Sequence, residues 1–274
     1  MFLNCKRALI IFLLLLLTAC EGEREKTALL LSQANQEWVD GQTQTAVSLY
    51  KNFLEQFPNE PETEEALFRL GEIYHFSLAK PKQAILYFQE VLLLNRQGKF
   101  SYEAQKYIAE IVEFKIRDYN QAILEYQTLI NRYGKMNENA DHHFRIVSIY
   151  YKLQNYDQVL SELEDHQEHY PDSKWGQSSE LKAVEILYTL GRCEEAQPHY
   201  KRFVKKYPTG KDRVEMEFVQ ASCLEDLGQF KLALKKFKSL GEKYPLPIIL
   251  EMKIAGLESR IKNGPKNKRT RRRR

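Results

Sequence analysis

A small or β-branched aliphatic residue recurs along this chain every 37 or 38 positions, and in five of six repeats an aromatic residue follows four positions later. Residues four apart lie on the same face of an α-helix. Each repeat therefore predicts a helix with one narrow buried stripe. The six recurring positions are Ala46, Ala84, Ala122, Val159, Ala196 and Ala233.

A second series of small or aliphatic residues precedes the first by 12 or 13 positions. Small side chains on two neighbouring helices let the helices approach closely. In four repeats a proline follows the first series by twelve positions, where it would end the second helix. The pattern predicts an all-α chain of antiparallel helix pairs. The second series is Ala34, Gly71, Ala109, Val147, Val184 and Ala221.

The segment Leu70-Gly71-Glu72-Ile73-Tyr74, followed by Ala84 and Phe88, resembles the tetratricopeptide repeat. The resemblance covers residues 27–246 and implies a right-handed solenoid of about six helix pairs. Two features depart from the family. The period exceeds the usual 34 residues, and Arg96 and Gly134 stand where other repeats have the terminal proline.

The ends of a solenoid need capping elements. Residues 247–262 carry apolar residues at helical spacing, and Asn263-Gly264-Pro265 would end that helix, so we expect a C-terminal capping helix. Residues 263–274 are basic and lack large apolar side chains, which predicts a disordered tail.

The N-terminus carries an apolar run, Ala8 to Leu17, behind Lys6-Arg7. The run is about half the ~20 residues that a helix needs to cross a bilayer, and its flanks are those of an export signal. Its end, Leu17-Thr18-Ala19-Cys20, resembles the bacterial lipoprotein signal. An ordinary signal peptide or an uncleaved short anchor is the alternative.

The lipoprotein resemblance implies that residues 1–19 are removed and that Cys20 is acylated at the start of a lipidated tether, residues 20–26. Several acyl chains on one cysteine would anchor the protein stably to a bilayer. Glu21 follows the cysteine, where lipoproteins that stay in the inner membrane often carry aspartate. The resemblance therefore implies the periplasmic face of the outer membrane of a Gram-negative envelope.

The charge is divided between an acidic body and a basic tail. Of the 41 Lys and Arg residues, two lie in the signal and eight in the last thirteen positions, which leaves 31 against 37 acidic residues. Export argues against a nucleic-acid partner, so we expect the tail either to contact anionic lipid or peptidoglycan or merely to solubilise the chain end. The tail arginines considered are Arg269, Arg271, Arg272, Arg273 and Arg274.

Two cysteines, Cys193 and Cys223, remain in the expected body of the mature chain. The repeat register places Cys193 in a turn and Cys223 inside the first helix of the next repeat. Because the geometric window for a disulfide is narrow, we expect two buried, unpaired thiols, with a bridge as the alternative.

The sequence contains no nucleophile elbow, phosphate-binding glycine loop or zincin motif. Asp141, His142 and His143 are adjacent and would point in different directions on a helix, while His166 and His169 lack further ligands. We therefore expect no metal, no cofactor and no enzymatic activity.

In tetratricopeptide proteins the first helix of each repeat lines a concave surface, and the resemblance carries those positions to this chain by register. The resulting groove is aromatic and acidic, so it would select basic or amide-rich partners. The alternative is that about half of the aromatic residues pack against the neighbouring repeat instead. The groove residues are Trp38, Phe68, Glu72, His75, Glu110, Glu113, Tyr151, Glu185 and Tyr188.

Together these features predict a non-enzymatic, lipid-anchored scaffold that binds other envelope proteins. The chain resembles the BamD family of outer-membrane assembly lipoproteins and the CpoB family of envelope proteins. The resemblance implies a role in outer-membrane protein assembly, with a β-barrel assembly component or a Tol-type component as the partner. The alternatives are a coordinator of cell division linked to peptidoglycan, a substrate-presenting subunit of a cell-wall enzyme, and a pilotin of type IV pilus secretins.

Overall fold

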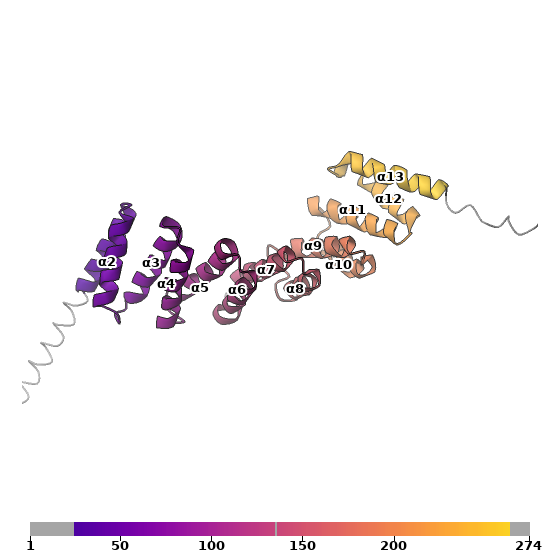
Figure 1. Ribbon diagram of the computed structural model, residues 1–274. Helices are drawn as coiled ribbons and strands as arrows, with labels where there is room; N and C mark the ends of the chain where they lie inside the picture. The colour runs from indigo at the N-terminus through magenta and orange to yellow at the C-terminus, as the bar shows by residue number, and fades with distance from the viewer. Residues whose placement is uncertain (1–24, 135, 264–274) are drawn as a thin grey trace, which may run out of the picture. The chain divides into compact units, whose positions relative to one another are not determined.

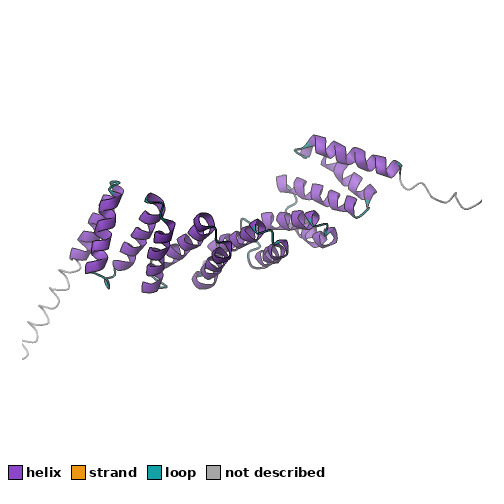
Figure 2. Cartoon of the chain, viewed as in Figure 1, coloured by secondary structure: helices purple, strands orange, loops and turns teal. Residues whose placement is uncertain are grey.

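The computed structural model describes residues 25–134 and 136–263, and every regular element in that part of the chain is helical (Figure 2). This confirms the expected all-α fold. The chain divides after Gly134 into two compact units. We call them the N-terminal unit, residues 1–134, and the C-terminal unit, residues 135–274.

The described part of the N-terminal unit contains three helix pairs (Figure 1). The first pair is a helix over residues 25–39 and α2 (Thr43–Gln56). The second is α3 (Thr63–Glu72), continued by the π-helical turn η1 (Ile73–Ser77), and α4 (Pro81–Leu94). The third is α5 (Ser101–Ile111), continued by the π-helical turn η2 (Val112–Ile116), and α6 (Tyr119–Tyr133).

The described part of the C-terminal unit contains three further pairs and one last helix. The pairs are α7 (Met136–Lys152) with α8 (Tyr156–His169), α9 (Gly176–Thr189) with α10 (Cys193–Lys206), and α11 (Lys211–Asp226) with α12 (Phe230–Leu240). A short 3-10 turn, η3 (Gly241–Lys243), leads to α13 (Pro247–Lys262). Leu250 and Leu257 of α13 pack on Ala221 and Phe237, so α13 covers the last pair.

All twelve small or aliphatic positions of the two repeat series are buried. Gly71 shows why the positions must be small: a Cβ atom there would overlap the ring of Phe88, which lies on the paired helix. The side chains of Phe88 and of its counterparts Tyr50, Tyr126 and Phe237 are fully or almost fully buried. The predicted helix pairs are therefore confirmed at the level of individual contacts.

The repeats with the longer internal spacing contain the π-helical turns. Gly71 and Ala84 are 13 positions apart, as are Ala109 and Ala122, whereas the other four pairs are 12 apart. The first helix ends in η1 or η2 only in these two of the six described repeats. A π-turn holds one extra residue without breaking the helix. It thus keeps both small residues in the helix interface.

Each turn within a pair holds one residue with positive φ, five positions before the small residue of the second helix. Glycine adopts this left-handed backbone conformation without strain. Other residues do so at a cost of about 1–2 kcal/mol. The six residues are Gly41, Ala79, Arg117, Gln154, Gly191 and Gly228.

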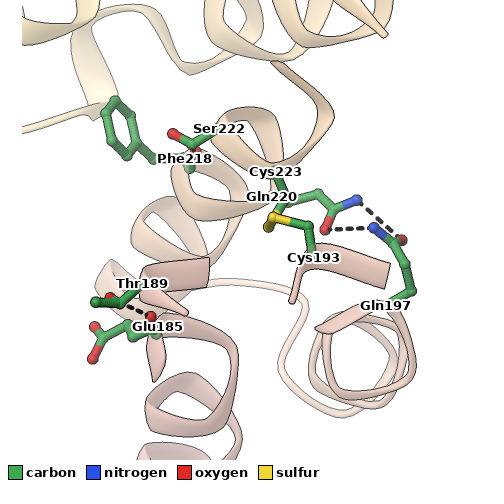
Figure 3. The surroundings of a disulfide bond; sticks show 8 residues. All are labelled: Glu185, Thr189, Cys193, Gln197, Phe218, Gln220, Ser222 and Cys223. Atoms are coloured by element: carbon green, nitrogen blue, oxygen red, sulfur yellow. Dashed lines mark hydrogen bonds between the residues drawn. A yellow bond between two sulfur atoms is a disulfide. The ribbon is translucent and has the colours of Figure 1, made fainter. Parts of the chain in front are cut away.

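A disulfide joins Cys193 to Cys223 (Figure 3). Our expectation of two unpaired thiols is therefore wrong. Cys193 begins α10, and stacking of the last helix pair brings α11 against it, with the two Cα atoms 5.3 Å apart. Beside the bridge, the amides of Gln197 and Gln220 donate hydrogen bonds to each other over 3.5 and 3.1 Å. The fifth and sixth repeats are thus linked both covalently and by a partly buried amide pair.

Candidate protein-interaction surface

Two of the predicted groove residues lie in the core of the N-terminal unit. Phe68 is 4% exposed and stacks on Phe100, with ring centroids 4.8 Å apart. Glu113 is 1% exposed and accepts a hydrogen bond of 2.8 Å from the Tyr126 hydroxyl. The assignment of Phe68 and Glu113 to an accessible groove is therefore wrong. The reason is that the first helix of one pair packs against its neighbours at these positions.

The other predicted residues of this unit remain partly accessible, and Glu72 among them is paired with a cation. Arg69 donates a hydrogen bond of 2.7 Å to Glu72 and also lies 6.0 Å from the centroid of the Trp38 ring. Glu110 is half-buried. His75 contacts Phe76, and its pKa is lowered by burial and by the nearby Lys115. Glu72 is thus one half of an ion pair rather than a free carboxylate.

An exposed apolar residue follows the small residue of each first helix in this unit by five positions. These residues are Val39, Phe76 and Phe114, which are 79%, 58% and 43% exposed. The same positions in the C-terminal unit hold Lys152, Thr189 and Asp226. The repeat register alone could have identified this apolar row, including Val39.

In the C-terminal unit, the structure brings three predicted residues into one pocket of about 280 Å³, which we call the tyrosine pocket. Tyr151 comes from α7, and Glu185 and Tyr188 come from α9. First helices of successive repeats therefore supply the walls, as expected for a repeat protein. Sequence reasoning did not select the remaining lining residues: Tyr156, Lys182, Ile186, Thr189, Leu190 and Val219.

The polar side of the tyrosine pocket is an ion pair. The Lys182 ammonium lies 3.0 Å from the Glu185 carboxylate and 5.2 Å from the centroid of the Tyr151 ring. Tyr151 meets Tyr156 edge to face. The pocket can therefore surround an apolar side chain and offer both a donor and an acceptor at its rim. The sequence suggested an acidic groove. Glu72 and Glu185 do not create one, because each is paired with a cation three residues earlier in the chain.

His143 and His166 of the C-terminal unit belong to one hydrogen-bonded network. The Nδ1 atoms of His143 and His166 are 3.2 Å apart, His143 Nε2 lies 3.0 Å from Glu162, and His166 Nε2 lies 3.0 Å from the Ser173 hydroxyl. Burial, aided by His143, lowers the pKa of His166 to about 4. Within residues 25–134 and 136–263, no group of three or more His, Cys, Asp or Glu residues could hold a metal ion.

The lipidation residue Cys20 and the tail residues Arg269, Arg271, Arg272, Arg273 and Arg274 lie outside the described residues. Among the helices that the structure does describe, none is long and apolar enough to span a bilayer.

Comparison with known families gives two matches. The family YfiO, outer membrane lipoprotein, matches residues 136–246, which hold the three helix pairs of the C-terminal unit. A tetratricopeptide repeat family matches residues 31–104 in the N-terminal unit. No curated protein matches the chain.

Several solved structures are similar to this chain, and one of them, with a TM-score above 0.5, supports the fold. The Naa15/Naa10 complex bound to HypK-THB has a chain that is 12% identical with a TM-score of 0.59; the match covers 87% of this chain and 35% of that one. A tetratricopeptide repeat protein from Parabacteroides merdae is 14% identical with a TM-score of 0.48, covering 88% of this chain and 94% of that one. Pseudomonas aeruginosa pilF is 13% identical with a TM-score of 0.42, covering 87% and 99%.

At these identities the similarity to solved structures bears on the fold alone. The helix pairs, their small-residue interfaces and the two family matches agree. The chain is an all-α protein of antiparallel helix pairs that resembles a tetratricopeptide repeat family over residues 31–104 and the YfiO outer membrane lipoproteins over residues 136–246.

Proposed function

We propose that this protein is a non-enzymatic, lipid-anchored scaffold that binds another envelope protein during outer-membrane protein assembly. Its repeats are of a protein-interaction type, and the lipoprotein match covers half of its helix pairs. The export signal and Cys20 supply the expected anchor. These features support the periplasmic face of the outer membrane as its location.

The observation that carries the proposal is the tyrosine pocket. Tyr151 and Tyr188 provide rigid aromatic walls, and aromatic residues in a partly enclosed site contribute much of the energy of protein interfaces. The Lys182–Glu185 pair can hydrogen-bond to the backbone of a partner segment whose apolar side chain enters the pocket. We expect an apolar anchor residue, rather than a basic residue, to be what the partner contributes.

The test is affinity capture from detergent-solubilised envelopes with the native chain and a Tyr151→Ala, Tyr188→Ala variant. Leu232→Ala is the matched control, because Leu232 is 55% exposed and lies on the second helix of the last pair, outside the pocket. Circular dichroism checks that both variants retain the helical fold.

The expected result is that the native chain and the control capture a β-barrel assembly protein, and that the pocket variant loses it. Capture of the same proteins by all three chains would overturn the role of the pocket. Capture of a Tol component, a pilus secretin or cell-wall fragments instead would replace outer-membrane assembly with the corresponding alternative role.

A further inference from the structure

One edge of the N-terminal unit lies where the described chain begins. The helix over residues 25–39 starts there, α2 and α4 end there, and α3 and α5 begin there, because the helices of a pair are antiparallel. The Lys26 ammonium lies 5.2 Å from the centroid of the Phe57 ring, and Phe57 is the C-cap of α2. The start of the chain and the turn between α2 and α3 therefore share this edge, which we call the tether edge.

The tether edge carries an apolar pocket of about 300 Å³. Leu93 and Leu94, the last two residues of α4, line it and are 77% and 45% exposed. Two adjacent exposed leucines at a helix end are unfavourable in water. The remaining lining residues are Leu54, Pro58, Thr63, Leu67 and Glu90.

Cations follow these leucines. Arg96 and Lys99 are exposed in the turn after α4. Tyr133, the last residue of α6, reaches the same edge, where its hydroxyl donates a hydrogen bond of 3.2 Å to the backbone carbonyl of Ser101, the first residue of α5. Burial raises the pKa of Tyr133, and the nearby Arg132 and Arg96 oppose that rise. By contrast, the turn between α2 and α3 carries Glu60 and Glu62. The edge is therefore apolar and basic at residues 93–99 and acidic next to them.

The distance to the expected anchor is short. Four residues separate Cys20 from the first described helical residue, Glu25. A fully extended chain spans at most about 3.6 Å per residue, so Cys20 would lie within roughly 18 Å of the tether edge. The apolar row of Val39, Phe76 and Phe114 lies at the other ends of the first helices. Because a 15-residue helix is about 22 Å long, this row is about one helix length away from the tether edge.

We propose that residues 93–99 rest on the anionic membrane surface to which the lipid on Cys20 tethers the chain. Leu93 and Leu94 enter the boundary between headgroups and acyl chains, and Arg96, Lys99 and Arg132 contact lipid phosphates. The inference rests on the lipid anchor of the proposed function. Its consequence is an orientation: the tether edge faces the bilayer, and the apolar row faces away from it, where a protein partner can reach it.

The test places a single reactive cysteine on each edge of the full-length, acylated protein purified from membranes. Leu93→Cys probes the tether edge, and Phe76→Cys is the matched control on the opposite edge, where Phe76 is 58% exposed. The native Cys193 and Cys223 are joined to each other, so a maleimide fluorophore labels the introduced cysteine. The labelled proteins are reconstituted into phosphatidylethanolamine and phosphatidylglycerol vesicles.

The expected result is that nitroxide-labelled lipids quench the probe at position 93. Aqueous iodide should quench the probe at position 93 several-fold less than it quenches the probe at position 76. Arg96→Glu with Lys99→Glu should restore iodide quenching at position 93. Equal iodide quenching at both positions in protein that floats with the vesicles would overturn the inference and leave the anchor intact. Failure of the protein to float after a high-salt wash would instead overturn the anchor, and the inference with it.

Discussion

The two units build the same repeat with different chemistry. In the N-terminal unit, Phe68, Phe88, Phe100 and Tyr107 form one aromatic cluster over Gly71, with ring centroids 4.8 to 6.0 Å apart. In the C-terminal unit a disulfide joins two repeats, and the carboxylates of Glu217 and Glu180 accept hydrogen bonds from Tyr200 and Arg202 on neighbouring helices. The small-residue register fixes the helix pairs, and either kind of contact can then hold successive pairs together.

Three glutamates of the C-terminal unit illustrate the second strategy. Glu180 accepts hydrogen bonds from Arg202, Glu217 accepts them from Tyr200 and Arg213, and Glu225 pairs with Lys253 and Arg260. Most of these contacts join different helices. In the N-terminal unit, by contrast, the pairs of Arg69 with Glu65 and Glu72 lie within α3. The chain has two tryptophans, Trp38 and Trp175, one in each unit, so unfolding of each unit can be followed separately.

Removing the central aromatic ring should cause the largest loss of stability, and this loss should be confined to the N-terminal unit. Phe88→Ala should lower the free energy of unfolding of that unit by about 3–5 kcal/mol, since Phe88 is fully buried. Urea unfolding followed by Trp38 fluorescence measures the change. Leu86→Ala, on the exposed face of the same helix, should change the midpoint little. An equal shift of the Trp175 transition by Phe88→Ala would show that the units unfold together.

Loss of the disulfide should have the next largest effect, and it should act on the other unit. The bridge closes a loop with a sequence separation of 30 residues, so Cys193→Ala with Cys223→Ala should destabilise the C-terminal unit by about 4 kcal/mol. Urea titrations with and without dithiothreitol measure the effect on the Trp175 transition. The Trp38 transition of the same samples is the internal control. If dithiothreitol shifted the Trp38 transition and left the Trp175 transition unchanged, the stabilising role of the bridge in the C-terminal unit would be contradicted.

The stability of the C-terminal unit should depend on pH through His166. The pKa of this buried imidazole falls from 6.5 to about 4, so between these values the unfolded chain binds a proton that the folded chain does not. Stability is therefore fully present above pH 6.5 and falls by about 3 kcal/mol as the pH drops to 4. His166→Gln should flatten the pH profile of the Trp175 transition over this window. His169→Gln, at an exposed position three residues away, should leave the profile unchanged.

The smallest expected effect concerns the left-handed turn residues. Ala79→Gly should stabilise the N-terminal unit by about 1 kcal/mol, because Ala79 has a φ of 51°. Gly191→Ala, at the matching turn of the C-terminal unit, should destabilise that unit by a similar amount. Thermal unfolding of both variants measures the difference. If Ala79→Gly destabilised the unit, the loss of the methyl group would outweigh the relief of strain in the left-handed backbone.

The sequence determined which residues form the interior of each helix pair. Gly71 and Ala84 were identified from spacing alone, and the same register locates the left-handed residue of the turn within each described pair. This succeeds because helical periodicity and the need for small residues between close helices act over one pair of about 30 residues. The extra residue in two repeats was visible as a spacing of 13, although its accommodation in a π-turn was not.

Only the tertiary structure decided how one pair meets the next. Phe68 and Glu113 share the register of accessible residues but are buried, whereas Tyr151, Glu185 and Tyr188 converge on one pocket. Cys193 reaches Cys223 because α11 stacks against the start of α10. These outcomes depend on side chains from different repeats meeting in three dimensions, and a repeating pattern that is the same in every repeat does not specify which side chains of neighbouring copies touch.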